Sequence, residues 1–124
     1  PLRMRAYERL ALLLERTTPE RMLVDINVTE MTPLQLQTHL IHTLRQEYNH
    51  NLSQQIYVSD ETWAMIENAQ MQTIAFCNSI AQQMPANSNA LDYAKTLITA
   101  YKSNGETPND LALQALKKEA QTLL

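Results

Sequence analysis

Hydrophobic residues recur every three to four positions along most of the chain, with polar residues between them. In the first stretch Ala6, Leu10 and Leu14 fall on one side of a helix, and charged residues fall mainly on the other side. The same spacing predicts helices over residues 1–17, 19–24, 33–55, 59–84, 90–104 and 108–124. Residues 25–31 break the pattern because apolar and polar residues alternate there, and we expect a loop or an extended segment.

Threonine–proline pairs mark three of these helix starts. Threonine accepts hydrogen bonds from the free amides of a first turn, and proline fits the first helical position because its missing N–H is not needed there. Thr32 is the clearest case, since Gln35 follows at capping-box spacing and Met31 and Leu36 stand at the spacing of a hydrophobic staple. The pairs are Thr18-Pro19, Thr32-Pro33 and Thr107-Pro108.

The segment 44–63 should contain a turn between two long helices. Residues 56–58 are β-branched or aromatic and continue a helix poorly. Ser59 is a good cap for a new helix, and Val58 and Trp63 stand at staple spacing around it. The helix that precedes the turn should bury Leu40, Ile41, Leu44, Tyr48, Leu52 and, at its end, Ile56.

The fold class follows from this helical spacing and from the scarcity of glycine. Gly105 is the only glycine and is placed to end the helix over residues 90–104 in a left-handed cap. Few other residues could supply the positive-φ turns of hairpins and barrels. We therefore expect an all-α fold, a bundle of four long helices plus one short helix, mostly antiparallel. A length of 124 residues fits a single helical domain over residues 1–124.

The composition disfavours several functional classes. No apolar run approaches the ~18 residues that a membrane helix requires. A net charge of −3 lacks the basic excess that neutralises phosphates, so we expect no nucleic-acid partner. Cys77, the only cysteine, excludes a disulfide within the chain and is interpreted as a small buried hydrophobe. One glycine cannot make a glycine-rich phosphate loop, and we expect no cofactor.

Glu47 and His50 have the spacing that di-iron carboxylate bundles use for two metal ligands from one helix. Such a site needs a second Glu-x-x-His pair and two further carboxylates, whereas His39 and His42 lie on the same helix as His50. A solvated helix face is the favoured interpretation. A metal-binding or enzymatic bundle that uses Glu47 and His50 remains the alternative, and we expect no catalytic residue and no enzyme.

Polar and aromatic residues gather near the turn in a composition typical of recognition surfaces. The alternative is that these groups satisfy one another around the turn. A third hypothesis is homo-oligomerisation through exposed leucines of the last helix. The candidate interaction residues are Arg45, Glu47, His50, Gln54, Tyr57 and Asp60.

Residues 1–23 and 44–63 resemble an uncharacterised family of small Bacteroidota proteins. The two segments read PLRMRAYERLALLLERTTPERML and LRQEYNHNLSQQIYVSDETW. In that family an N-terminal membrane helix and a charged stalk precede a helical domain, and basic residues follow the membrane segment. The resemblance implies that this chain is the soluble domain of a membrane-anchored protein, and the positive-inside rule would place it at the cytoplasmic face of the bacterial inner membrane. It brings no known activity, ligand or catalytic residue.

The first helix is consistent with an upstream segment. Arg3, Arg5 and Arg9 would put positive charge at the positive end of a helix dipole if the helix began at Pro1. The mismatch disappears if the helix starts earlier.

From the composition, the residues near the turn and the resemblance, we expect a non-enzymatic scaffold or protein-interaction domain. It would be attached to the membrane through a segment absent from this chain. Its partner would be an unknown protein or a second copy of itself.

Overall fold

The computed structural model describes residues 1–123, which are about 81% helical and contain no strand. The all-α prediction is confirmed. The elements are α1 (Leu2–Arg16), α2 (Pro19–Leu23), the 3-10 helix η1 (Val28–Glu30), α3 (Pro33–His50), the 3-10 helix η2 (Leu52–Tyr57), α4 (Asp60–Gln83), α5 (Ala90–Ser103) and α6 (Pro108–Thr122). None of the helices in this range has the length and hydrophobicity needed to cross a membrane.

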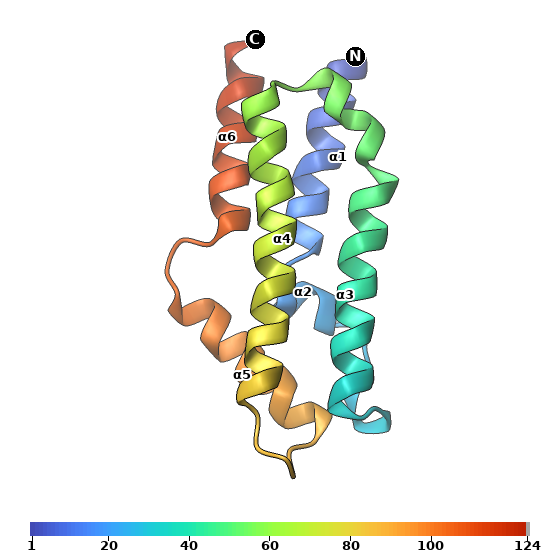
Figure 1. Cartoon of the computed structure of the whole chain (residues 1–124). Helices are drawn as coiled ribbons and strands as arrows, with labels where there is room; N and C mark the ends of the chain where they lie inside the picture. The colour runs from blue at the N-terminus through green and yellow to red at the C-terminus, as the bar shows by residue number, and fades with distance from the viewer. Residues whose placement is uncertain (124) are drawn as a thin grey trace.

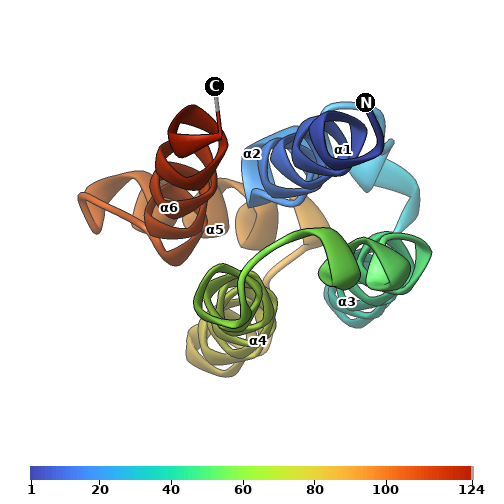
Figure 2. The same ribbon diagram turned by 90° about the horizontal axis from the view of Figure 1, so that it is seen from above.

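Four helices, α1, α3, α4 and α6, run along the long axis of the molecule (Figure 1) and stand at four corners when viewed from its end (Figure 2). Helix α4 contacts α3 and α6, and α6 also contacts α1. Neighbouring helices run in opposite directions, and η2 contacts both α1 and α3 at the end where the termini lie. The helix predicted over residues 90–104 is also present as α5, which has 14 residues and is inclined across the opposite end, so residues 1–123 contain a fifth helix of this length class beside the four that the expected bundle counted.

The predicted caps are present. The hydroxyl of Thr32 accepts a hydrogen bond from the Gln35 amide (3.1 Å), and the Gln35 side chain accepts one from the Thr32 amide (2.9 Å). The hydroxyl of Ser59 accepts from the Thr62 amide (3.1 Å) and begins α4. Gly105 ends α5 with φ +69. Side-chain caps at the other threonine–proline pairs are Thr18 before α2 and Thr107 before α6.

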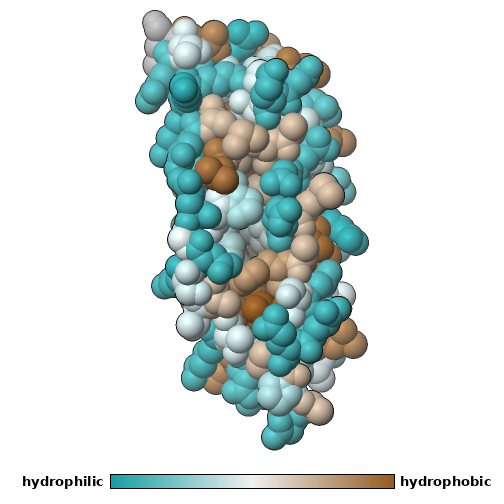
Figure 3. Space-filling view, turned by 60° about the vertical axis from the view of Figure 1, so that its left-hand side comes forward, coloured by the Kyte–Doolittle hydropathy of each residue, from teal (hydrophilic) through white to brown (hydrophobic). Residues whose placement is uncertain are grey.

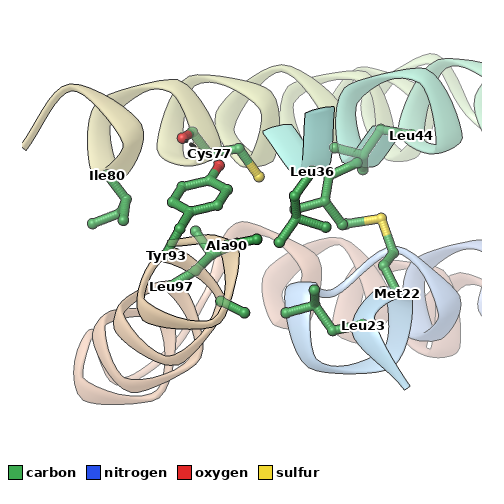
Figure 4. Close-up of a cluster of buried hydrophobic side chains, with 11 residues drawn as sticks. Met22, Leu23, Leu36, Leu44, Cys77, Ile80, Ala90, Tyr93 and Leu97 are labelled. Carbon is green, nitrogen blue, oxygen red and sulfur yellow. Dashed lines mark hydrogen bonds between the residues drawn. The ribbon is translucent and has the colours of Figure 1, made fainter. Parts of the chain in front are cut away.

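One cluster of buried residues lies at the end of the bundle where α5 packs. Figure 4 shows this α5 cluster, in which the Tyr93 ring lies beside Cys77 and its hydroxyl donates a hydrogen bond to the Cys77 carbonyl (2.8 Å). Cys77 is fully buried, as its position on the apolar side of α4 predicted, and burial raises the pKa of its thiol to about 12. The cluster consists of Met22, Leu23, Leu36, Leu40, Leu44, Cys77, Ile80, Ala90, Tyr93, Ala94 and Leu97.

A second cluster lies at the other end, where α1 and α6 pack against the first half of α4. This α1/α6 cluster consists of Tyr7, Leu10, Leu13, Leu14, Trp63, Ile66, Ala69, Ala112 and Leu116. Val58 packs against it from the turn, together with Trp63 in the same cluster, as the predicted hydrophobic staple requires. Helix α4 contributes to both clusters and connects the two ends of the core.

Candidate interaction surface

Asn51 determines where α3 ends. Its side-chain amide donates a hydrogen bond to the carbonyl of Glu47 (2.8 Å), and its backbone amide donates to the carbonyl of Tyr48 (3.1 Å). An asparagine side chain that bonds a carbonyl of the preceding turn competes with the helical hydrogen-bond ladder. The next residues therefore form the tighter η2, which has about three residues per turn instead of 3.6.

This change of helix type reverses the predicted burial at the turn. Leu52 is 42% exposed and Ile56 is 75% exposed, whereas the side chain of Gln54 is only 8% exposed. The prediction that a helix continues to residue 55 and buries Leu52 is wrong, because a 3-10 helix rotates each position relative to a continued α-helix. We name the exposed or half-buried side chains Leu52, Gln55, Ile56, Tyr57 and Asp60 the turn surface.

The six predicted interaction residues differ in exposure. Arg45, His50 and Asp60 are exposed, and Glu47 and Tyr57 are half-buried. Gln54 is buried and donates a hydrogen bond to the hydroxyl of Ser53 (3.3 Å). Throughout residues 1–123, no hydrogen bond or ion pair joins the side chains of any two of the six. Mutual satisfaction of these side chains is therefore not what holds the turn.

Contacts from α1 and α4 hold the turn instead. The guanidinium of Arg9 donates a hydrogen bond to the His50 carbonyl (3.2 Å), which ties the end of α3 to α1. Below the turn the rings of Tyr48 and Trp63 lie with centroids 5.4 Å apart at an interplanar angle of 36°. These contacts hold the backbone of η2 against α1 and α4, so the exposed side chains project from a defined backbone.

Glu119 of α6 binds the first turn of α4. Its carboxylate accepts hydrogen bonds from the backbone amide of Ser59 (3.1 and 3.2 Å), the hydroxyl of Thr62 (2.8 Å) and the hydroxyl of Tyr7 (3.1 Å). Burial by itself would raise the pKa of this carboxyl. The hydrogen bonds from Ser59, Thr62 and Tyr7 outweigh burial and lower the pKa below its ordinary value of 4.5.

Hydrophobic spacing did not predict the role of Glu119, although the sequence places this residue on the side of the last helix that is buried. Ala112 and Leu116 are buried, and Glu119 continues their helical side at the next turn. A carboxyl on the buried side of a helix requires a partner. The partners themselves lie in α1 and at the start of α4, and helical spacing does not reveal which residues these are.

Asn109 forms a second buried polar contact, at the start of α6. Its amide donates hydrogen bonds to the Leu14 carbonyl (2.7 Å) and the Thr17 hydroxyl (3.3 Å), and its carbonyl accepts one from the Thr73 hydroxyl (3.3 Å). One side chain thus joins the end of α1 and the middle of α4 to α6. This arrangement satisfies buried polar groups and needs no ligand.

The histidines do not assemble a metal centre with neighbouring acids. His39, His42 and His50 are exposed on α3. In the part of the chain that the structure describes, no three His, Cys, Asp or Glu side chains lie in an arrangement that could hold a metal ion. Glu47 and His50 border a small cavity of about 210 Å³ between α1 and α3, together with Arg9 and Arg16.

Comparison with known proteins identifies the family. Residues 1–123 match the sequence model of a family described as a family of unknown function, DUF7935. The match covers almost the whole chain, so the chain belongs to this family. No curated protein matches the sequence, and no solved structure matches the fold.

Proposed function

We propose that this DUF7935 domain is a non-enzymatic protein-interaction module that binds its partner through the turn surface. The observation that carries the proposal is the exposure of Ile56, at 75%, on a turn held by contacts from α1 and α4. Leu52, in the same 3-10 helix η2, is also exposed. A backbone that is already held in position loses little entropy on binding, which favours the use of its exposed apolar side chains in recognition.

The polar residues around Leu52 and Ile56 indicate the chemistry of the partner. Asp60 and Glu61 are exposed at the start of α4, and Gln55 and Tyr57, the chain neighbours of Ile56, offer hydrogen-bonding groups. An interface of this kind has a small apolar centre and a polar rim. The partner would present a complementary apolar patch with a basic group that faces the two acids.

The position of the turn surface bears on the proposed membrane anchor. Both termini and the connection from α3 to α4 lie at one end of the molecule (Figure 1). Arg3 and Arg5 of α1 are exposed at this end. We propose that an anchor precedes α1. The turn surface would then face the cytoplasmic side of the membrane and the basic residues would face anionic lipid, which favours a partner that is itself at the membrane.

The proposal is tested by placing a photo-crosslinking amino acid at position 55 of the intact protein in its own cells. We expect a discrete crosslinked product that Ile56→Asp removes. The same amino acid at Gln82, exposed near the far end of α4, should not give that product. Met71→Asp is the matched substitution control, because Met71 is 66% exposed on α4 away from the turn. A product that survives Ile56→Asp but not Met71→Asp would refute the turn surface as the binding site.

Self-association is a second candidate. Leu111 is exposed on α6 and borders a shallow hollow of about 310 Å³ together with Ala64 and Met65. Two copies could bury these apolar groups against each other. Native mass measured over a range of protein concentrations should then increase with concentration, and Leu111→Ser should abolish the increase. A constant monomer mass would exclude this candidate.

A further inference from the structure

An open groove of about 860 Å³ lies between residues 25–31 and the first half of α3, at the end of the molecule opposite to the termini (Figure 1). None of the residues that line it belongs to the turn surface. On the α6 side of the molecule, hydrophobic residues form only a broken strip between hydrophilic ones (Figure 3). In this α3 groove, by contrast, apolar side chains gather beside two acids. The apolar ones are Ile26, Met31 and Leu34, and the acids are Asp25 and Glu30.

The apolar part of the α3 groove rests on the core. Ile26 and Met31 are half-buried and pack against the α5 cluster, whereas Leu34 is 69% exposed in the first turn of α3. The backbone between them is held by hydrogen bonds from the Ile26 amide to the Leu23 carbonyl and from the Met31 amide to the Val28 carbonyl (both 3.2 Å). The groove is therefore formed before anything binds, which lowers the entropic cost of binding.

The two acids of the α3 groove have no partner among the described residues. Asp25 and Glu30 are exposed, and neither side chain makes a hydrogen bond or an ion pair with any residue from 1 to 123. No lysine or arginine of this range lines the groove. Uncompensated negative charge beside an apolar surface favours an occupant that is both apolar and cationic, and it repels an anion.

The shape of the α3 groove favours a peptide over a small molecule. Leu34, Thr38 and His42 line it at intervals of one turn, so it follows α3 for about 12 Å, the length of two helical turns. Small-molecule sites enclose most of the surface of their ligand. All the residues that α3 contributes to this groove are exposed, and a helix laid along α3 would cover them.

We propose that the α3 groove binds a short, basic, amphipathic helix of a partner protein. Apolar side chains one turn apart on that helix contact Ile26, Met31 and Leu34, and a lysine or arginine beside them pairs with Asp25 and Glu30. This site is independent of the turn surface, because the two lie toward opposite ends of α3, a helix about 27 Å long. One domain can thus hold two proteins at the same time.

A synthetic helical peptide of about 14 residues is a suitable probe. It carries two leucines one turn apart and two lysines on the adjoining side, and in the control peptide glutamates replace the lysines. Each is titrated into the ¹⁵N-labelled chain and followed by the backbone amide signals of residues 25–42. We expect the lysine peptide to shift these signals saturably, with an affinity that falls as salt is added, and the glutamate peptide to give no saturable shift.

Substitutions at exposed positions of the groove test each part of the contact. Leu34→Ser should weaken the lysine peptide about tenfold because apolar contact is lost. Glu30→Gln should weaken it about threefold, as expected for one exposed ion pair. Met71→Ser is the matched apolar control, since Met71 is 66% exposed on α4, and Glu61→Gln is the matched acidic control. Both controls should bind as the unaltered chain does.

Three results would overturn the proposal. The first is the absence of saturable shifts in residues 25–42, or shifts that Leu34→Ser leaves unchanged. The second is binding of hexylammonium as tight as that of the lysine peptide, which would assign the α3 groove to a small organic cation. The third is a change of the same signals with the concentration of the chain alone, which would assign the groove to a second copy.

Discussion

Glu119 accepts a hydrogen bond from the backbone amide of Ser59, which lies 60 positions earlier in the chain (3.1 Å). The side chain of Ser59 caps α4 by accepting a hydrogen bond from the Thr62 amide. The backbone amide of the same residue donates to the Glu119 carboxylate of α6. A negative carboxylate at this place also interacts favourably with the positive end of the α4 dipole. The contact fixes the start of α4 to α6 and thereby helps to hold the turn surface.

Glu119→Gln should destabilise the domain. The amide retains one acceptor oxygen for three donor groups and has no negative charge, so we expect the free energy of unfolding at pH 7 to fall by about 1–2 kcal/mol. Chemical denaturation monitored by circular dichroism measures the change. Glu15→Gln is the control, because Glu15 is exposed on α1, and it should have little effect. Equal stability of the two variants would contradict the role given to Glu119.

The same carboxylate should make stability depend on pH in the acidic range. Its pKa in the folded state is lower than in the unfolded state, so the unfolded state binds the proton first as pH falls. The contribution of Glu119 is therefore complete above about pH 5 and is lost as pH falls from about 4.5 through the lower pKa of the folded state. The stability difference between the unaltered chain and Glu119→Gln, measured from pH 7 to pH 3, should shrink over this range. A difference that stays constant to pH 3 would argue against the lowered pKa.

Tyrosine-to-phenylalanine changes at two positions of α5 should have opposite effects on stability. Tyr93→Phe removes a buried hydrogen bond and should lower the free energy of unfolding by about 1 kcal/mol. Tyr101→Phe removes a buried hydroxyl that makes no hydrogen bond to any residue from 1 to 123, and should raise the free energy of unfolding by a similar amount, about 1 kcal/mol. Thermal unfolding of the two variants side by side gives the sign of each change. If both changes destabilise, the Tyr101 hydroxyl already has a partner.

Asn109→Ala should be among the more costly single substitutions at a polar position. It removes hydrogen bonds to α1 and α4 and leaves the buried hydroxyl of Thr73 with fewer partners. We expect a loss of about 2–3 kcal/mol in the free energy of unfolding. Asn87→Ala, in the exposed loop before α5, should change stability by less than about 0.5 kcal/mol and serves as the control in the same denaturation series.

Features set by neighbouring residues were predictable from the sequence. The Thr32 cap, the Ser59 cap with its Val58 and Trp63 staple, and the Gly105 helix end each depend on residues within five positions, and all are present. The error at Leu52 and Ile56 arose because hydrophobic spacing assumes a single helical period. The side chain of Asn51 changes that period by bonding the Glu47 carbonyl.

Contacts between distant residues were not predictable. Glu119 lies on the buried side of α6, yet its partners Tyr7, Ser59 and Thr62 belong to two other helices. Their identity depends on how the helices pack, which the spacing of hydrophobic residues does not reveal. The burial of Gln54 is a similar case. Gln54 is buried because the 3-10 helix turns its side chain toward the residues of α1 and α4 that support the turn. Its burial removes one residue from the predicted interaction surface.

The division of the core into two clusters means that each end of the molecule carries its own natural reporter. Trp63, the only tryptophan, lies in the α1/α6 cluster, and Cys77, the only cysteine, lies in the α5 cluster. Tryptophan emission and the rate at which the Cys77 thiol reacts with a labelling reagent would therefore follow the opening of the two ends separately, without any substitution in the chain. If α4 transmits unfolding cooperatively from one end to the other, the two signals will change together, and if the ends fray independently they will separate.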